Sequence, residues 1–133
     1  MAENKIEQFL INLMYTYQQV GDNLWLIGDA EHGLDGVAVA LTDSLVTVRV
    51  VVMDDPKNMS LEFYSTLLKL NADLIHGAYA LSSGKVLLID TLEYDTMDFG
   101  EFRAVLDAFS LALSEHYPVL SKFRVRPEQA GGK

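Results

Sequence analysis

The residues with the clearest capacity for chemistry lie in the stretch GDAEHGLDG, residues 28–36. It brings three carboxylates and one imidazole together, from Asp29, Glu31, His32 and Asp35. Side chains of these types can hold a divalent cation. However, an EF-hand that began at Asp29 would need a bidentate glutamate where Ala40 stands, and no H-E-x-x-H motif occurs. Acidic stretches containing glycine are typical of solvated hairpin loops, so we expect no metal site here.

A second acidic group follows later in the chain. Its members are Asp90, Glu93, Asp95, Asp98 and Glu101. Paired carboxylates can divide the acid and base roles of a reaction when their surroundings push their pKa values apart. Asp98 and Glu101, however, have the spacing of a helix capping box, and the others lie in a polar connector. We therefore predict that this group begins a helix and carries no catalytic pair.

The joint at His76 and Gly77, between an apolar helix end and a strand, raises the question of a reactive centre. A buried histidine beside a carboxylate can act as a general base. No nucleophile motif adjoins His76 in the sequence, and a residue at such a joint more often satisfies the last helix carbonyls. We interpret the joint as a corner. The enzyme alternative needs a cleft in which His76 or His32 meets a carboxylate.

Composition restricts the possible functions further. The chain has 133 residues, enough for one domain, which we place at residues 1–126 with a flexible tail at 127–133.

Ten basic and nineteen acidic residues give a net charge of −9, which disfavours nucleic acid and anionic membranes as partners. With no cysteine, thiolate metal sites and disulfides are excluded, and we expect a cytoplasmic protein. Glycine-rich phosphate-binding motifs are absent, so no cofactor is expected.

The helices and strands that position these residues are predicted by the spacing of the apolar residues. Apolar residues recur at helical spacing over residues 3–19, 60–73 and from 98 onward. Strand-like alternation occupies 24–27, 36–41, 45–53, 77–81 and 85–92. The predicted class is α+β, with the order helix, three strands, helix, two strands, helix, and an antiparallel sheet packed against the helices.

Apolar surface is in excess of what one core needs. Half of the residues are hydrophobic and the mean hydropathy is +0.14. The strand at 45–53 has apolar side chains on both faces, and the helix at 60–73 has two apolar stripes. Pairing two copies of the chain would cover the apolar surface that one core leaves exposed. We predict a homodimer or partner-binding surface built around Val51, Met53, Leu61, Tyr64 and Leu68.

The element order, together with the segments LLKLNA, GAYAL, KVLLIDTL and FRAVLDAF within residues 60–117, resembles the YbjN-like family and the type III secretion chaperones of the Tir-chaperone (CesT-like) kind. The resemblance implies a small acidic bacterial protein of the cytoplasm that forms homodimers and acts without catalysis. Secretion chaperones of this fold hold an extended segment of another protein against apolar patches. The resemblance supplies no catalytic residues.

The function predicted is therefore that of a non-catalytic chaperone or adaptor, a homodimer that binds an extended segment of a client protein. Two alternatives remain. A regulatory module could bind a small ligand between the sheet and the helices, and an enclosed pocket would favour it. An enzyme could use a pair formed by a histidine and a carboxylate.

Overall fold

The computed structural model describes residues 4–56 and 60–124. The helices are Lys5–Leu13 (α1), Leu61–Asp73 (α2) and Phe99–Leu120 (α3), with short 3-10 turns at Ala30–His32 (η1) and Ser121–Phe123 (η2). The strands are Tyr17–Gly21 (β1), Leu24–Asp29 (β2), Leu34–Thr42 (β3), Leu45–Asp54 (β4), Ala78–Ser82 (β5) and Lys85–Glu93 (β6). The predicted tail, residues 127–133, lies outside the described residues.

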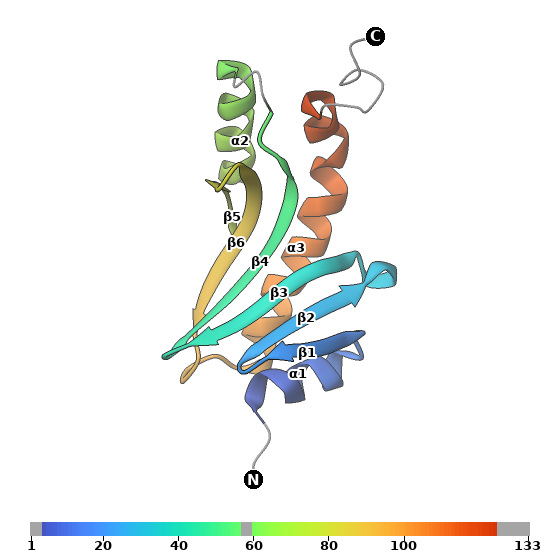
Figure 1. The fold of residues 1–133 in the computed structure, drawn as a ribbon, viewed down its shortest axis with the longest axis vertical. Coiled ribbons are helices and arrows are strands. Elements are labelled where there is room, and N and C mark those ends of the chain that lie inside the picture. The colour runs from blue at the N-terminus through green and yellow to red at the C-terminus, as the bar shows by residue number, and fades with distance from the viewer. Residues whose placement is uncertain (1–3, 57–59, 125–133) are drawn as a thin grey trace.

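The strands form one sheet in the order β1-β2-β3-β4-β6-β5, and all neighbours are antiparallel. The long helix α3 runs behind the sheet, while α1 lies near β1 and α2 lies near β5 and β6 (Figure 1). The predicted α+β class, an antiparallel sheet packed against helices, is confirmed.

The first helix is shorter than predicted, and a strand replaces its second half. Asn4 caps α1 by accepting from the Ile6 N–H, and the helix ends at Met14, whose φ of 61° is left-handed. The chain then turns into β1, which pairs with β2 from Tyr17 opposite Ile27 onward. The predicted helix over residues 3–19 is therefore wrong beyond Leu13, and four strands, not three, precede α2.

A bulge in β4 changes the face on which its last residues lie. Val46, Val48 and Val50 are buried in the core, as alternation requires. The register with β6 then shifts between Val51 and Met53, so one extra residue is accommodated. Met53 consequently packs in the core at 7% exposure. Met53, which was predicted to share a dimer or partner-binding surface with the half-exposed Val51, thus lies on the opposite, core face of β4.

The core lies between the sheet and the helices. From α3, Phe102, Leu106 and Phe109 are fully buried against the valines of β3 and β4. Asp98 begins this helix with the predicted capping box: its side chain accepts from the Glu101 N–H, and the Glu101 side chain accepts from the Asp98 N–H. These contacts account for two of the five acids in the second acidic group.

The joint between α2 and β5 is shaped by Gly77. Its φ of +89° lies in the left-handed region, and a β-carbon placed there would sit 3.0 Å from Phe109 Cε1 and 3.4 Å from the Ile89 carbonyl oxygen. Phe109 is a core residue, so the chain passes directly over the core at this point. The conformation and the space at Gly77 both identify the joint as a corner.

Candidate protein-binding surfaces

One apolar surface lies on the outer side of α2. Ser60 caps this helix by accepting from the Phe63 N–H, and Phe63 and Leu67 face the core. The opposite stripe, which we call the α2 stripe, consists of Leu61, Tyr64 and Leu68. Leu61 is 88% exposed and Leu68 is 70% exposed. Tyr64 is half-buried beside them, so three of the five residues predicted to bind a partner share one helix face.

The Tyr64 side chain is also held at its hydroxyl end. Its hydroxyl lies 3.4 Å from Asp55 Oδ1 in the connection between β4 and α2. Burial and the nearby Asp55 carboxylate raise the pKa of Tyr64, so its hydroxyl remains neutral and can donate to Asp55. This bond fixes the Tyr64 ring along the stripe.

The second apolar surface is the face of the sheet that does not carry the core valines. Because strand side chains alternate, Val51 lies on this open sheet face, where it is half exposed. Arg49 lies on the same face, in register with Ala38 of β3 and Ile89 of β6. The five predicted residues thus fall into three places: Val51 on the open sheet face, Met53 in the core, and the others on α2.

The two edges of the sheet differ in a way that the sequence did not reveal. At the β5 edge, the Tyr79 N–H donates to Asn71 Oδ1 at 2.6 Å, and Asn71 Nδ2 donates to the Tyr79 carbonyl at 3.4 Å. The Asn71 amide therefore takes the place of a neighbouring strand. A side chain of α2 thus occupies this edge at Tyr79, where an added strand would otherwise bond.

At the other edge, Gln18 to Gly21 of β1 are exposed. The Gly28 N–H donates to the Thr16 carbonyl at 2.9 Å, so Thr16 and Gly28 face each other in a hydrogen-bonded position. Antiparallel ladders alternate, which turns the main-chain groups of Gln18 toward β2 and those of Gln19 away from it. The β1 edge therefore presents the Gln19 N–H and carbonyl to solvent.

The loop at residues 28–36 contains a histidine–carboxylate pair. His32 Nδ1 lies 2.8 Å from Asp29 Oδ1, and Asp29 is buried. The same carboxylate accepts from the Thr16 N–H at 2.8 Å and from the His32 N–H at 3.1 Å. Ser110, which lines the neighbouring cavity, donates its hydroxyl proton to the His32 carbonyl. Asp29 thus ties η1 to the start of β1.

The hydrogen bonds that the Asp29 carboxylate accepts make the stability of the fold depend on pH. The hydrogen bond from the Thr16 N–H lowers the pKa of Asp29 most, and the bonds from His32 lower it further. Together they outweigh burial, which raises it, and bring the pKa below its ordinary value of 3.8. A lowered pKa means that the ionised carboxylate stabilises the fold above about pH 4, and that this contribution is lost as the pH falls through the folded-state pKa. We expect Asp29→Asn to reduce the free energy of unfolding at pH 7, with a smaller difference from wild type at pH 3.

Urea unfolding between pH 7 and pH 3 measures this difference. Asp22→Asn, in the exposed turn after β1, controls for the removal of one negative charge. A constant difference between Asp29→Asn and wild type across the range would contradict the role assigned to the Asp29 carboxylate.

The other two histidines lie apart from any such pair. His76 is half-buried and lines an open cavity with Asp90, Glu93 and Glu101, but no hydrogen bond or ion pair joins it to them in the described part of the chain. His116 is buried, and its Nδ1 lies 2.6 Å from the Tyr79 hydroxyl. Within residues 4–56 and 60–124, no three metal-ligating side chains are grouped so as to hold an ion.

The class of protein is a two-layer α+β domain with an antiparallel sheet and an exposed apolar stripe on α2. Residues 1–126 match the family CesT_Tir_1, and the chain belongs to this family. The predicted kinship with Tir-type secretion chaperones is confirmed. No curated protein sequence matches the chain. Among the described residues, no helix has the length and hydropathy needed to cross a membrane.

Solved structures share the fold at low sequence identity. YbjN from E. coli is 14% identical with a TM-score of 0.60, covering 85% of this chain and 89% of its own. A chain of the heterodimeric ExoU-SpcU complex from the type III secretion system of Pseudomonas aeruginosa is 16% identical with a TM-score of 0.69, covering 85% and 95%. A chain of the HopA1-SchA chaperone-effector complex is 8% identical with a TM-score of 0.61, covering 84% and 88%.

Proposed function

We propose that this protein is a non-catalytic chaperone or adaptor that forms a homodimer and binds an extended segment of a client protein. The observation that carries the proposal is the exposure of Leu61 and Leu68 on α2, in a chain whose core is already complete without them. Membership of a chaperone family and the fold shared with chains of chaperone-effector complexes support it. The absence of cysteine fits a reducing cytoplasm.

The dimer is assigned to the α2 stripe. Leu61, Tyr64 and Leu68 are spaced at three and four residues, so they form a continuous ridge on one side of the helix. Two such ridges related by a twofold axis would cover each other, because an interface of that symmetry uses the same patch on both copies. Each leucine removed from water would contribute about 1.5–3 kcal/mol.

The client segment is assigned to the β1 edge. An extended peptide that adds to a sheet gains main-chain hydrogen bonds, and its alternate side chains contact the sheet faces. On β5 the Asn71 amide occupies the main-chain groups of Tyr79, whereas β1 presents the main-chain groups of Gln19. On the open sheet face, Leu26 of β2 adjoins Gln18 of β1 in register and is 37% exposed. It offers an apolar contact for a segment that lies along β1.

Replacement of Gln19 by proline tests the client assignment. Proline removes the outward N–H and places a ring against an incoming strand, but leaves the bonds between β1 and β2. We expect Gln19→Pro to lower the capture of client from a lysate by about tenfold, since each main-chain bond contributes about 1 kcal/mol and the ring adds a steric block. Quantitative mass spectrometry of the captured proteins, with limited proteolysis to find the protected client segment, gives the readout.

Gln19→Ala is the matched control, because it removes the same side chain and keeps the N–H. Circular dichroism and sizing of both variants establish that the fold and the oligomeric state are unchanged. Equal capture by Gln19→Pro and Gln19→Ala would show that the client binds elsewhere.

A further inference from the structure

The open sheet face, on which Val51 and Arg49 lie, is covered by no helix of the described chain. α3 runs behind β3 and β4, and no helix lies in front of these strands (Figure 1). Its apolar side chains are exposed in part, since Val51 is 52% exposed and Leu26 is 37% exposed. The α2 stripe, to which the dimer is assigned, belongs to a helix, so this face remains for a different contact.

One row of side chains crosses this face through all six strands. The registers place its members opposite one another in turn: Gln18 of β1, Leu26 of β2, Ala38 of β3, Arg49 of β4, Ile89 of β6 and Ala78 of β5. Arg49 is exposed and is the single charged residue in the row. Because β4 is an inner strand, a cation is placed well inside an otherwise uncharged row.

Arg49 is also isolated from charge along the strands. On β4 itself, its neighbours on the same face are Thr47 and Val51. The residues opposite these two are uncharged as well: Ala40, Leu87 and Thr91. On this face of β6, charged side chains occur only at Lys85 and Glu93, each four residues from the partner of Arg49, or about 14 Å along a strand. No acid of the face is therefore close to Arg49 in register.

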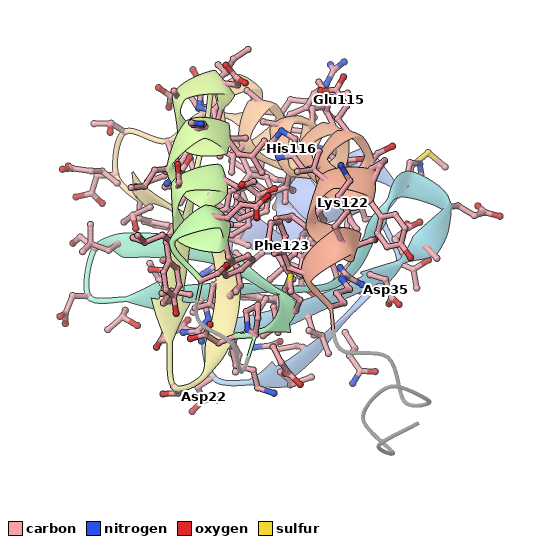
Figure 2. The ribbon with its side chains drawn as sticks, turned by 90° about the horizontal axis from the view of Figure 1, so that it is seen from above. Asp22, Asp35, Glu115, His116, Lys122 and Phe123 are labelled. Atoms are coloured by element: carbon pink, nitrogen blue, oxygen red, sulfur yellow. The ribbon has the colours of Figure 1, made fainter. Side chains whose placement is uncertain are left out.

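Two acids of the strands that flank β4 lie on the side of the helices. Asp90 of β6 is opposite Val48, which is buried in the core. Asp35 of β3 lies beside the end of α3 (Figure 2), where it lines a cavity with residues of that helix. Within residues 4–56 and 60–124, no hydrogen bond or ion pair involves the Arg49 guanidinium. Its donors are exposed and available to a partner.

We propose that the open sheet face binds a segment of the client protein in which one carboxylate, from an aspartate or a glutamate, is flanked by apolar side chains. The carboxylate accepts hydrogen bonds from Arg49, and the apolar side chains cover Leu26 and Ile89. The surface is continuous with the proposed client edge, because Leu26 adjoins Gln18 of β1 in the same row. The inference rests on the chaperone function proposed above and adds the chemistry of the client.

Charge is the reason for expecting a carboxylate at this position. The chain has a net charge of −9, so its surface as a whole repels an acidic partner. At Arg49 an acid is attracted instead. A bond between a guanidinium and a carboxylate is charge-assisted and directional, and it strengthens when apolar side chains exclude water from it. Arg49 therefore fixes where the segment lies on a face that is otherwise uncharged around it.

A second copy of this chain fits the face less well than a client segment does. A twofold axis through the middle of the face would bring two Arg49 side chains together with no acid beside them. Like charges placed opposite each other in an interface are costly. The occupant expected is therefore a different polypeptide, which supplies the acid that this face lacks around Arg49.

Selection from a random peptide display library tests the proposal on the full chain. Wild type should enrich peptides that carry an acid between apolar residues. Arg49→Gln should lose the preference for the acid, and Arg49→Glu should enrich peptides with a lysine or arginine at that position. Arg103→Glu, on the exposed side of α3 in an ion pair with Asp107, is the matched charge reversal and should enrich the same peptides as wild type.

Titration of one enriched peptide, and of its analogue with glutamine in place of the acid, measures the size of the effect. We expect wild type to bind the acidic peptide about tenfold more tightly than the analogue, and Arg49→Gln to bind the two equally. The methyl NMR signals of Leu26, Val51 and Ile89 report where the peptide lies. Circular dichroism of each variant reports that the fold is intact.

The proposal is overturned if wild type shows no preference for an acid, or if the methyl shifts lie away from the open sheet face. Enrichment of the same peptides by Arg49→Glu and wild type would assign Arg49 to the solubility of an exposed face, and conversion of a dimer to monomers by Arg49→Gln would assign the face to a second copy. Either result would likewise overturn it.

This test is separate from that of the client edge. Acidic enrichment that persists in the Gln19→Pro variant supports the open sheet face as a binding surface even if the client does not pair with β1. A client that is captured through Gln19, by a wild-type protein with no preference for acidic peptides, would overturn the present proposal and leave the chaperone function standing.

Discussion

The double substitution Leu61→Glu and Leu68→Glu should convert the proposed homodimer into monomers at micromolar concentration. Both side chains are largely exposed in one copy, so the folded monomer tolerates the change. In a dimer built on the α2 stripe, the glutamates would replace buried leucines with unpaired carboxylates. A combined loss of about 4 kcal/mol raises the dissociation constant about a thousandfold. Size-exclusion chromatography with light scattering measures the change.

The matched control replaces two other exposed apolar residues. Ile11 on α1 is 49% exposed and Leu111 on α3 is 57% exposed, so Ile11→Glu with Leu111→Glu adds the same charge away from α2. This variant should remain dimeric. A wild-type protein that is monomeric at micromolar concentration, or a dimer that survives both α2 substitutions, would refute the interface.

Gly77→Ala should destabilise the fold through both backbone strain and a contact with the core. A non-glycine residue at a φ of +89° is strained by about 1–2 kcal/mol, and the new β-carbon would press on Phe109 Cε1 at 3.0 Å. Phe109 is fully buried, so relief requires a shift in the core, with a further cost of about 1–3 kcal/mol. Urea unfolding should report a total loss of about 2–5 kcal/mol.

Gly84→Ala separates the two causes. Gly84 has a φ of +77° but no atom within 4 Å of the added β-carbon, so this variant carries the backbone strain without the contact. We expect a loss of about 1–2 kcal/mol. Equal losses for the two variants would show that Gly77 does not serve the packing of Phe109, and the interpretation of the joint as a corner over the core would need revision.

Helix caps and tight turns could be predicted from the sequence alone. The capping box at Asp98 and Glu101, the Ser60 cap of α2 and the turn between β5 and β6 were all predictable, because each depends on neighbours in the chain. In that turn, Ser83 and Gly84 take positive φ values of 53° and 77°, as a two-residue hairpin loop requires. The α+β class followed from the order of these local elements.

The first helix shows where periodicity failed. Leu13, Met14 and Tyr17 continue the apolar spacing of α1 in the sequence, yet Met14 ends the helix in a left-handed conformation. The pairing of β1 with β2, and the bond from the Tyr17 hydroxyl to Glu7, stabilise a strand instead. The pairing of β1 with β2 therefore outweighs the helical spacing in the sequence. No residue between Met14 and Tyr17 indicates that the helix ends and a strand begins.

The positions of the proposed partner-binding residues were only partly predictable, for a related reason. Leu61 and Leu68 follow from the two stripes of α2, because helical spacing fixes their side. Met53 was misplaced because a bulge shifts the period of two by one residue, and alternation alone gives no sign of it. The signal for the covered position on β5 was Asn71, an amide in the LLKLNA segment, but its partner Tyr79 is known only from the fold.

The Asn71 amide also limits how these molecules can assemble. A sheet with two accessible rims can recruit copies at both ends and grow into a filament. Here the β5 rim already has its main-chain groups at Tyr79 engaged by α2, so a further strand that joined β5 would lose the hydrogen bonds at that position. Growth of the sheet through β5 is thereby disfavoured at this position, in a chain rich in valine and leucine.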